Sequence, residues 1–457
     1  MLHPTLFEQD VRLLGHRWSP RVHELKRFLA RSGVRFRWFD LDIEGEAEIR
    51  RIVAEAGSTS QTYPIVILPD GDVLSDPDIE TLAERLGLPT EPTSTLYDLV
   101  VIGGGPAGLA ASIYAGSEGL RTVVVEQDVP GGQASYSAMI ENYPGFPSGL
   151  DGSDLARRTV EQSERFGGEI VVTRRATSLR CDGLERRVTL DDGTELGAHT
   201  VVLAIGVSFR WLDAPGCAAL VGAGVYYGAA TVEASACRGQ EVYVLGGGNS
   251  AGQAALFLAR FDRQVHIMTL GDGLAESMSR YLVDRIQQTP NVAVHPHTTV
   301  MDAGGTGHVE WILIRDTRGD EARRVPADAL FVFIGAAPRS DWLAGTIDRD
   351  DEGFLLCGLD YLTEVPEDWP LDRRPYPLET RVPGVFVAGD VRRGSVKRLT
   401  VAAGEGAAAI DLVHRYLAAT FDEPARQDPE AASAPMTAAA SCGNATHPFS
   451  PCSLPDG

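Results

Sequence analysis

The stretch from Tyr97 to Glu126, YDLVVIGGGPAGLAASIYAGSEGLRTVVVE, decides the fold of the larger part of this chain. An apolar run, LVVIG, turns through glycines into an alanine-rich segment, and a second apolar run, TVVVE, follows. This order predicts a buried strand, a helix and a second buried strand. The glycines are Gly103, Gly105 and Gly108. The first allows a tight turn, the second lets a phosphate approach the backbone, and the third lets the helix pack closely on the strand.

The start of this predicted helix suits the pyrophosphate of a dinucleotide. Its first N–H groups have no partner within the helix, and the helix dipole favours an anion there. Pro106 and Ala107 stand between the second and third glycines. Glu126 ends the second strand, where the carboxylate of such units accepts hydrogen bonds from ribose hydroxyls. Strand, helix, strand and acid together predict a dinucleotide-binding unit.

A second segment, EVYVLGGGNSAGQAALFLARFDRQVHIMTL, repeats this pattern. Gly246 and Gly248 take the first two glycine positions, Ala251 takes the third, and Asn249 and Ser250 lie between them. Two such units in one chain imply two dinucleotides. The simplest arrangement is a flavin held by one unit and reduced by a nicotinamide held by the other.

Length and composition indicate a soluble protein of about three domains. The hydrophobic fraction of 44% is sufficient for buried cores. No apolar run approaches the ~20 residues of a membrane-spanning helix, and MLHPTLFEQDVR lacks the features of a secretory signal. The net charge of −22 disfavours nucleic acid and anionic membranes as partners. We therefore expect a cytoplasmic protein that binds neither nucleic acid nor membrane.

The six cysteines show no CxxC and no regular spacing. This pattern is not typical of a disulfide-stapled secreted protein and gives little support for a structural zinc site, so no metal is expected. We expect the first four to be small buried or half-buried side chains. These four are Cys181, Cys217, Cys237 and Cys357. The other two, Cys442 and Cys452, lie in an Ala/Pro/Ser-rich tail, residues 419–457, that we expect to be disordered.

Residues 1–90 form a separate predicted domain. VRLLG and VRFRWFDLD predict strands on either side of an amphipathic helix at 20–32, and a second helix is predicted at 46–56. YPIVILPDGDVL then gives an apolar run followed by an Asp-Gly turn, and a short helix is predicted to end at Gly87. The Pro/Ser/Thr stretch at 90–95, TEPTST, is typical of a linker.

This order of elements resembles the thioredoxin/glutaredoxin fold. Trp18-Ser19-Pro20-Arg21 stands where that family carries its CxxC, and Tyr63-Pro64 stands where it carries a cis-proline. Both redox cysteines are absent, so this position has no thiolate to exchange disulfides. The resemblance therefore implies an adaptor, docking or dimer-supporting role.

From about Tyr97 to Tyr416 the chain resembles the low-molecular-weight thioredoxin reductase group of pyridine-nucleotide flavoproteins. Beyond the two glycine motifs, the resemblance rests on stretches in the order of that family. They are Gly131-Gly132-Gln133, Glu141-Asn142-Tyr143-Pro144-Gly145, Ala204-Ile205-Gly206, FVFIGAAP at 331–338 and GVFVAGD at 384–390.

The resemblance implies roles for these residues. Gly132, Gln133 and Asn142 would line FAD, Asp390 after Gly389 would accept from a ribityl hydroxyl, and Ala204 and Gly206 belong to the same FAD site. The stretch that starts with Lys397, Arg398 and Leu399 would cover the flavin ring and begin a helix. Glu405 is either an acid near the ring or an ordinary first-turn helix acid. No side chain is assigned as catalytic.

The implied architecture is α/β. A thioredoxin-like domain at 1–90 precedes two Rossmann-like, three-layer ββα nucleotide-binding domains. The FAD domain, 97–212 and 339–418, is interrupted by the NAD(P)H domain, 213–338. Two crossing strands near WLDAPG and APRSDWL are expected to join the domains, and rotation of one domain would bring the nicotinamide to the flavin. The resemblance also implies a homodimer.

The chain departs from this family at the reactive cysteines. The family has Tyr-Cys-Ala-Thr-Cys-Asp-Gly before the second glycine motif, whereas the aligned residues 227–233 read YGAATVE. Without these sulfurs there is neither a nucleophile for a disulfide nor a dithiol to take electrons from the flavin. The identity of the electron acceptor therefore stays unknown.

The chain also departs from the family in the coenzyme site. Members that use NADPH carry a His-Arg-Arg cluster after the second strand of the nicotinamide domain, and Thr269-Leu270-Gly271 stands there in this chain. Asp272 follows at once, and Arg280 is the next cation along the chain. The resemblance implies NADPH, whereas the residues themselves favour NADH, and both coenzymes stay open.

We expect an FAD-dependent NAD(P)H oxidoreductase, with three alternatives. One is a ferredoxin- or flavodoxin-type electron transferase, in which the tail residue Phe449 covers the flavin. Another is a disulfide reductase that uses Cys442 and Cys452 as a mobile dithiol. The last is a non-catalytic flavin-binding sensor or adaptor, which the presence of both glycine loops disfavours.

Overall fold

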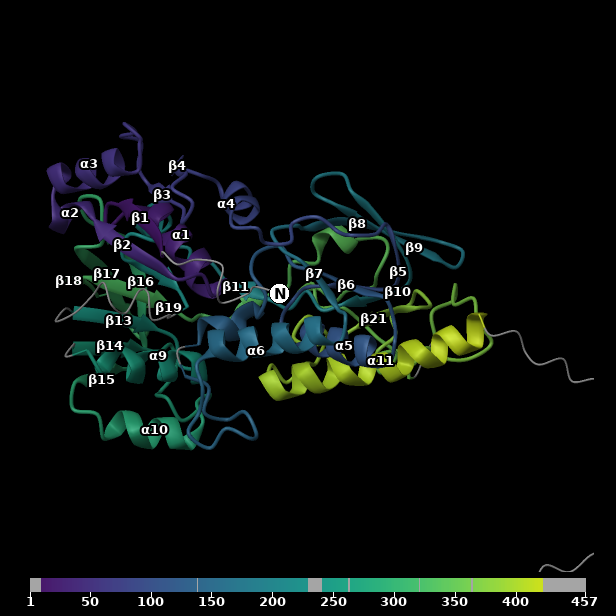
Figure 1. Cartoon of the computed structure of the whole chain (residues 1–457). Coiled ribbons are helices and arrows are strands. Elements are labelled where there is room, and N and C mark those ends of the chain that lie inside the picture. The colour runs from purple at the N-terminus through teal and green to yellow at the C-terminus, as the bar shows by residue number, and fades with distance from the viewer. Residues whose placement is uncertain are drawn as a thin grey trace, which may run out of the picture.

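A computed structural model describes residues 10–137, 139–228, 241–261, 264–319, 321–362 and 365–421. Within these ranges the strands form five sheets, and the helices pack against the larger ones (Figure 1). None of the helices in the described ranges is long and apolar enough to cross a bilayer.

The N-terminal unit, from β1 to α4, is built on a mixed four-stranded sheet of order β2-β1-β3-β4. Its strands are β1 (Val11–Gly15), β2 (Phe36–Asp40), β3 (Ile65–Ile67) and β4 (Val73–Ser75). Its helices are α1 (Pro20–Arg31), α2 (Leu41–Glu44), α3 (Glu46–Glu55) and α4 (Ile79–Arg85). β1 is parallel to β2 and antiparallel to β3. The Tyr63-Pro64 peptide is cis.

The predicted elements of this unit are confirmed with one difference. The second predicted strand ends at Asp40, because the Asp40 side chain accepts a hydrogen bond from the Asp42 N–H and caps the short helix α2. The 90–95 stretch has no regular secondary structure but is held in place. Thr93 donates from its N–H and its hydroxyl to the Glu169 carboxylate, at 2.6 and 2.8 Å.

The first glycine-loop unit contains a seven-stranded sheet of order β7-β6-β5-β10-β9-β8, with β21 paired to β10. Its strands are β5 (Leu96–Ile102), β6 (Thr122–Val125), β7 (Glu169–Val171), β8 (Ala176–Asp182), β9 (Glu185–Leu190), β10 (Glu195–Leu203) and β21 (Val385–Val387). Its helices are α5 (Pro106–Ser117), η1 (Gly132–Tyr136), α6 (Gly152–Arg165), η2 (Asp341–Leu343) and α11 (Leu399–Phe421). Strand β21 follows the second unit in sequence, so this sheet is completed after that unit.

The second glycine-loop unit contains a parallel five-stranded sheet of order β12-β19-β13-β14-β15 and an antiparallel sheet of order β16-β17-β18. Its strands are β12 (Val225–Tyr227), β13 (Glu241–Leu245), β14 (Gln264–Met268), β15 (Val292–His295), β16 (Thr298–Gly304), β17 (Trp311–Asp316), β18 (Ala322–Pro326) and β19 (Ala329–Val332). Its helices are α7 (Pro215–Ala219), α9 (Asn249–Ala259) and α10 (Arg280–Gln287).

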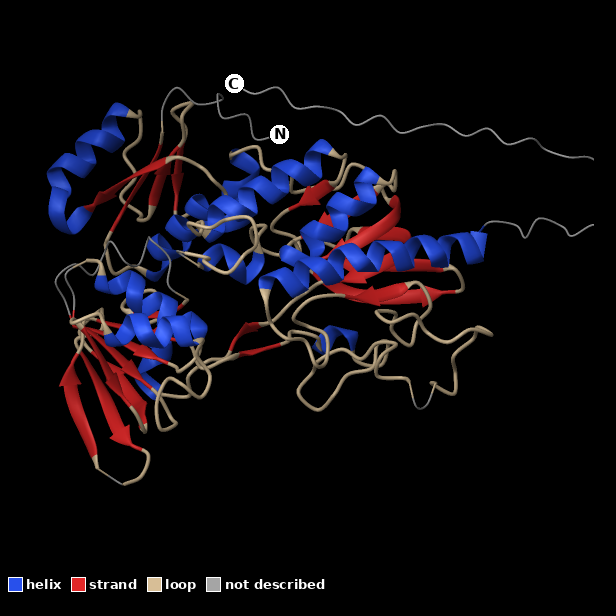
Figure 2. Ribbon diagram, turned by 90° about the horizontal axis from the view of Figure 1, so that it is seen from below, coloured by secondary structure: helices blue, strands red, loops and turns tan. Residues whose placement is uncertain are grey.

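A short antiparallel ribbon joins the two glycine-loop units. It consists of β11 (Ser208–Phe209) and β20 (Ala336–Ala337), and Figure 2 shows it between the larger sheets. The expected pair of crossing strands is therefore confirmed, although β11 ends before the WLDAPG stretch that begins at Trp211. The helix α11 corrects the expected start of the tail. It continues through Phe421, whose ring lies 4.6 Å from the His199 ring.

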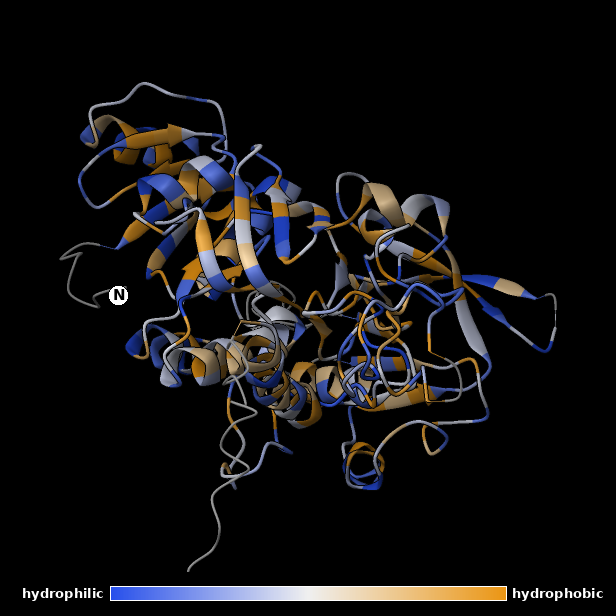
Figure 3. Ribbon diagram, turned by 90° about the vertical axis from the view of Figure 1, so that its right-hand side faces the viewer, coloured by the Kyte–Doolittle hydropathy of each residue, from blue (hydrophilic) through white to orange (hydrophobic). Residues whose placement is uncertain are grey.

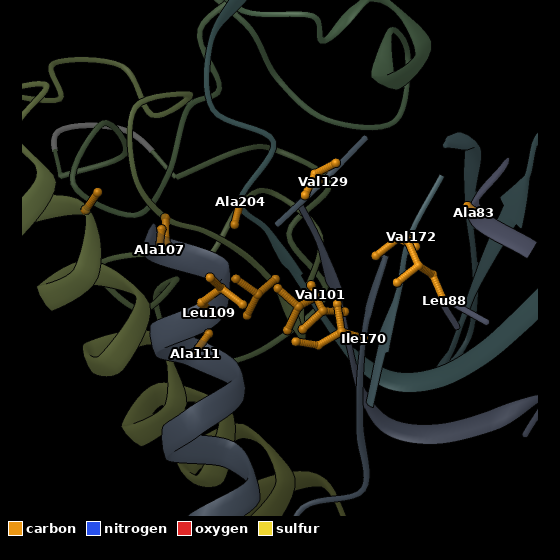
Figure 4. Close-up of a cluster of buried hydrophobic side chains, with 14 of the residues drawn as sticks. Ala83, Leu88, Val101, Ala107, Leu109, Ala111, Val129, Ile170, Val172 and Ala204 are labelled. Carbon is orange, nitrogen blue, oxygen red and sulfur yellow. The ribbon is translucent and has the colours of Figure 1, made fainter. Parts of the chain in front are cut away.

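The hydrophobic core of the N-terminal unit is continuous with that of the first glycine-loop unit. Leu82, Ala83 and Leu88 belong to the same buried cluster as Ile170 and Val172. Figure 4 shows part of this cluster, and Figure 3 shows hydrophobic residues running along the strands. The second glycine-loop unit has clusters of its own on the two faces of its sheet.

Candidate functional site

The first glycine loop leaves space in front of helix α5. Gly103 has a φ of +104°, and a Cβ there would clash with the carbonyl oxygen of Ala204. A Cβ at Gly108 would clash with the carbonyl oxygen of Gly103. Gly105 caps α5, Pro106 is its first residue, and the nearest atom to a Cβ at Gly105 would be 3.9 Å away. The helix start is therefore open to an anionic group.

The Glu126 carboxylate lies against this loop. One oxygen accepts a hydrogen bond from the Gly104 N–H at 2.7 Å, and the other accepts from the Asp128 N–H at 3.0 Å. Burial raises the pKa of Glu126. Each carboxylate oxygen keeps a second lone pair, so Glu126 can accept further hydrogen bonds beside the loop.

The loop from Gly131 to Gln133 lies over the first glycine loop. The Gly131 N–H donates to the Gly104 carbonyl at 2.7 Å, and a Cβ at Gly132 would lie 3.0 Å from the Gly105 Cα. The Gln133 amide donates to the Val207 carbonyl at 2.6 Å. Because Val207 follows the Ala204-Ile205-Gly206 stretch after β10, three stretches that are distant in sequence meet here.

Asp390 completes this site from the far end of the chain. It follows β21 and Gly389, and its Oδ1 atom is buried without a hydrogen-bond partner. Burial raises the pKa of Asp390. A buried carboxylate oxygen without a hydrogen-bond donor destabilises the folded chain. We therefore expect a ligand that supplies a donor at this site. The ribityl hydroxyls of FAD are such donors.

Helix α11 is tied to this loop by Glu405. Its carboxylate accepts from the Gly389 N–H at 2.8 Å and from the Arg392 guanidinium at 2.6 Å. Glu405 therefore braces the loop that carries Asp390, and it is not a first-turn helix acid, because α11 begins six residues earlier at Leu399. Lys397 and Arg398 directly precede α11, which begins at Leu399 as expected, and the Lys397 ammonium lies 4.4 Å from the Phe354 ring centre.

These observations fit FAD. The open helix start suits a pyrophosphate, Glu126 can accept hydrogen bonds from a ribose, and Asp390 lacks the donor that a ribityl chain provides.

Asn142 is exposed on the loop that follows η1. Its neighbour Glu141 instead reaches the second unit, where it accepts from the Arg285 guanidinium at 2.7 and 2.8 Å.

The second glycine loop has a similar open helix start. Gly246 has a φ of +144°, and a Cβ there would clash with the Phe333 carbonyl oxygen. Gly248 caps α9, and a Cβ there would have no atom within 4 Å. Ala251 is buried and Ser250 is exposed. The Asn249 side chain accepts from the Ser279 N–H at 2.7 Å, which fixes the start of α10 beside the loop.

A cleft lies between the two glycine-loop units at the connecting ribbon. Its walls are Gln133, Tyr136, Ser137 and Met139 from the first unit, Gly228, Ser250, Gln253, Ala254 and Phe333 from the second, and Phe209 from the ribbon. It is therefore bounded by the loop over the first glycine motif and by the helix that follows the second. A ligand at either loop can reach this cleft.

The end of β14 carries acids. Residues 269–279, TLGDGLAESMS, contain no lysine or arginine. Glu276 accepts from the Asp272 N–H at 2.9 Å, and Asp272 pairs with His297 at 3.0 Å. The Arg280 side chain is 92% exposed and its Nε atom lies 3.7 Å from Asp284. This edge therefore offers carboxylates where a 2′-phosphate would need cations.

Three cysteines lie in the described residues, and each sits in hydrophobic surroundings. Cys217 is buried in the second unit, Cys357 is buried in the first, and Cys181 packs partly buried against the same cluster as Cys357. Burial raises the pKa of Cys217 and of Cys357 to about 11. Such thiols are poor nucleophiles at neutral pH. Cys237, Cys442 and Cys452 lie outside the described residues.

Gly228, the first of the two positions at which the resemblance implies a cysteine, lines the cleft. Gly228 has a φ of +96°, and a Cβ there would lie 3.5 Å from the Phe209 ring and 3.6 Å from the Tyr136 Cβ. The second position, Thr231, lies outside the described residues. Sequence reasoning missed Tyr136 and Phe209 as cleft residues, because no motif marks them.

Comparison with known proteins agrees with this geometry. The family model described as pyridine nucleotide-disulphide oxidoreductase matches residues 97–406. Thioredoxin reductase of Peptoclostridium acidaminophilum is 32% identical over 334 residues, which cover 72% of this chain and 99% of that protein. The bifunctional thioredoxin reductase/thioredoxin of Mycobacterium leprae is 33% identical over 324 residues, which cover 71% of this chain and 66% of that protein.

A solved structure is also similar. The crystal structure of Lactococcus lactis thioredoxin reductase in its FR conformation is 27% identical, with a TM-score of 0.63, and the match covers 71% of this chain and 99% of that chain. The thioredoxin reductase-like family consists of FAD-dependent oxidoreductases that use FAD and NADPH. The chain belongs to the pyridine nucleotide-disulphide oxidoreductase family, as a thioredoxin reductase-like member of the low-molecular-weight type.

Proposed function

We propose that this chain takes electrons from a nicotinamide nucleotide into FAD and passes them to an acceptor without the dithiol of its family. The observation that carries the proposal is the buried Asp390 Oδ1, which has no hydrogen-bond partner and lies beside the first glycine loop. A second feature is the helix after the second glycine loop, which lines the cleft between the two units. The first feature supports a bound flavin, and the second supports its reduction within the chain.

The proposed FAD domain comprises residues 97–212 and 339–418, and the proposed NAD(P)H domain comprises residues 213–338. The strand pairing of β21 with β10 supports this division. The proposed FAD site consists of Gly103, Gly105, Pro106, Ala107, Gly108, Glu126, Gly132, Gln133, Asn142, Ala204, Gly206, Gly389, Asp390, Lys397, Arg398 and Leu399. The proposed nicotinamide site consists of Gly246, Gly248, Asn249, Ser250 and Ala251.

The protein contributes mainly position and electrostatics to the reaction. Bound FAD supplies a hydride acceptor and a two-electron carrier. The starts of α5 and α9 hold phosphates through backbone N–H groups and the helix dipole. Glu126 and Asp390 orient the ribose and the ribityl chain through accepted hydrogen bonds. The cleft brings the two ligands together, so the main catalytic contribution of the chain is proximity.

The proposed acceptor is a small molecule or a redox protein that reacts without a protein dithiol. Gly228 and Thr231 replace the usual sulfurs. The three described cysteines lie in hydrophobic surroundings, and burial raises the pKa of each. A homodimer is proposed on the ground of the family alone.

We also propose that NADH is preferred to NADPH, although the family uses NADPH. Asp272 and Glu276 lie beside the end of β14 and would repel a 2′-phosphate. The Glu276 carboxylate packs against Gly271, where a Cβ would contact it, so little space remains for that phosphate. A ribose 2′-hydroxyl, in contrast, can donate to a carboxylate at this edge.

The N-terminal unit is proposed to have the thioredoxin fold without its chemistry. The strand order β2-β1-β3-β4, with β1 parallel to β2 and antiparallel to β3, supports the fold. Trp18-Ser19-Pro20-Arg21 contains no sulfur, so no redox function is proposed for this unit.

The test is steady-state oxidation of NADH and NADPH by the full chain loaded with FAD. We expect turnover with ferricyanide and with a soluble quinone, and none above background with oxidised thioredoxin. A dithiol-containing thioredoxin reductase, assayed in parallel, is the control for the disulfide assay. Efficient reduction of thioredoxin by this chain would overturn the proposal, as would the absence of flavin reduction by either nucleotide.

A further inference from the structure

The N-terminal unit contacts both glycine-loop units through helix α1 (Figure 1). The first turn of α1, which follows the Trp18-Ser19 pair, faces the second unit. The last turn, which ends at Arg31, faces the first unit. One rigid helix of 12 residues therefore connects the two units whose relative position defines the cleft.

At its last turn, α1 inserts Arg31 into the first glycine-loop unit. The Arg31 side chain is only 8% exposed and pairs with Asp128. It donates to the Ser135 hydroxyl at 2.9 Å, to the Tyr136 hydroxyl at 2.7 Å and to the Val129 carbonyl at 3.0 Å. All these partners lie between 128 and 136, the segment that includes the loop over the first glycine motif.

Tyr136 is fixed by the same helix. The guanidinium groups of Arg27 and Arg31 lie 4.6 and 4.2 Å from the centre of its ring. Because Tyr136 lines the cleft, α1 reaches the candidate site through one intermediate side chain. Arg31 is therefore a positioning residue for this loop.

Further contacts make this attachment firm. The Val172 N–H donates to the Pro89 carbonyl at 2.9 Å, and Arg174 pairs with Glu80 on α4. The hydrophobic core is shared across the same boundary (Figure 4). A continuous buried core resists separation far more than a polar contact does.

At its first turn, α1 packs against the second glycine-loop unit. The Trp18 ring stacks on the His308 ring at 4.8 Å between centres and 12° between planes. The His23 ring lies 5.1 Å from the Tyr226 ring. A Cβ at Gly222 would lie 3.0 Å from the Pro20 Cα and 3.4 Å from the His23 Cβ, so the backbones approach closely.

We infer that the N-terminal unit is an internal clamp that holds the two glycine-loop units in one orientation, with the cleft formed, throughout turnover. This inference rests on the proposed function. The ribbon of β11 and β20 is too short to fix the two units by itself, whereas α1 is attached to both. The clamp removes the domain rotation expected from the sequence, and no dithiol at 228 and 231 has to reach the flavin in a second orientation. It also occupies the Trp18 end of the unit, so that end is not a docking surface for a partner.

Covalent closure of the clamp provides the decisive test. Trp18→Cys and His308→Cys are combined in the full chain, loaded with FAD, and joined by a short bifunctional maleimide. Each single variant treated with the same reagent is the control for modification of other cysteines. Turnover with ferricyanide before cross-linking tests the proposed function separately. If the double variant turns over, we expect cross-linking to leave the rate within about twofold. Loss of turnover on cross-linking, with no loss in the single variants, would overturn the clamp.

Releasing the 128–136 segment from α1 is the complementary test. Arg31→Met is expected to raise amide hydrogen exchange in residues 128–136 and to lower the rate of flavin reduction at saturating nucleotide at least tenfold. The Kd for the nucleotide should change little, because Arg31 does not contact the second glycine loop. Arg51→Met is the matched control, since the ion-pair partners of Arg51 among the described residues are Glu48 and Glu55, on the surface of α3. Unchanged exchange and an unchanged reduction rate in Arg31→Met would also overturn the inference.

Discussion

Replacing Asp390 by asparagine is expected to weaken FAD binding and, at the same time, to stabilise the protein without FAD. The side chain keeps its shape, but its charge is removed. In the absence of a ligand, Asp390 Oδ1 is buried without a donor, and burial raises the pKa of this carboxyl group. For an acid whose folded pKa is raised, the contribution to stability is fully present below the unfolded pKa and is lost as the pH rises through the folded pKa. Near neutral pH, the charged form of Asp390 therefore destabilises the FAD-free protein.

The size of both effects follows from this environment. A hydrogen bond from a ribityl hydroxyl to a charged acceptor contributes about 1.5–3 kcal/mol, so Asp390→Asn should raise the Kd for FAD about 10- to 100-fold. Relief of the buried charge is worth on the order of 1 kcal/mol, which corresponds to a rise in Tm of about 2 °C for a chain of this size.

The two effects are measured on the same preparations. FAD is removed, Tm is recorded for the FAD-free protein, and FAD is titrated back with flavin fluorescence as the signal. Asp411→Asn is the control, because Asp411 lies on the exposed side of α11 and its ion-pair partner in the described part of the chain is Arg415. If Asp390→Asn bound FAD as tightly as the unaltered protein, the assignment of this residue to the flavin would be wrong.

Three further predictions concern the coenzyme, pH and the thiols. Leu270→Arg combined with Glu276→Gln should raise kcat/KM for NADPH relative to NADH at least about tenfold, since the first change adds a guanidinium and the second removes a repelling carboxylate; an unchanged ratio would exclude this edge as the coenzyme determinant. Burial and two neighbouring cations lower the pKa of His23 from 6.5 to about 3. Its contribution to stability is present above pH 6.5 and is lost as the pH falls toward about 3, so Tm should fall less across this window in His23→Gln, and equal slopes would contradict the assignment. Cys217 and Cys357 should resist iodoacetamide at neutral pH in the native protein and react after unfolding, as measured by mass spectrometry, and rapid native labelling would contradict their burial.

The parts of the structure that the sequence could predict are those with local signals. The glycine loops, the strands beside them and the start of α11 are each determined by residues close in sequence. Gly103 and Gly246 mark the loops because their backbone conformation and close contacts exclude side chains. Asp390 could be predicted only through the resemblance, since one acid after a short strand is not distinctive.

The contacts between units could not be predicted in this way. From the sequence, Arg31 is an ordinary cation in the last turn of an amphipathic helix. In the structure it lies buried among residues almost a hundred positions away. Glu141 belongs to a stretch that the resemblance assigns to the flavin, and it pairs with Arg285 of the other unit instead. Such contacts depend on how finished units pack together, and no periodicity along the chain encodes that packing.

The most direct test of the central claim is an anaerobic reductive titration of the full, FAD-loaded chain with NADH and, in parallel, with NADPH, counting electrons taken up per flavin. The account predicts about two electrons per FAD, because it assigns electron storage to the flavin alone. It also predicts that NADH is the better reductant. An uptake of about four electrons per FAD would contradict the account, because it would require a second two-electron centre such as a disulfide of Cys442 and Cys452.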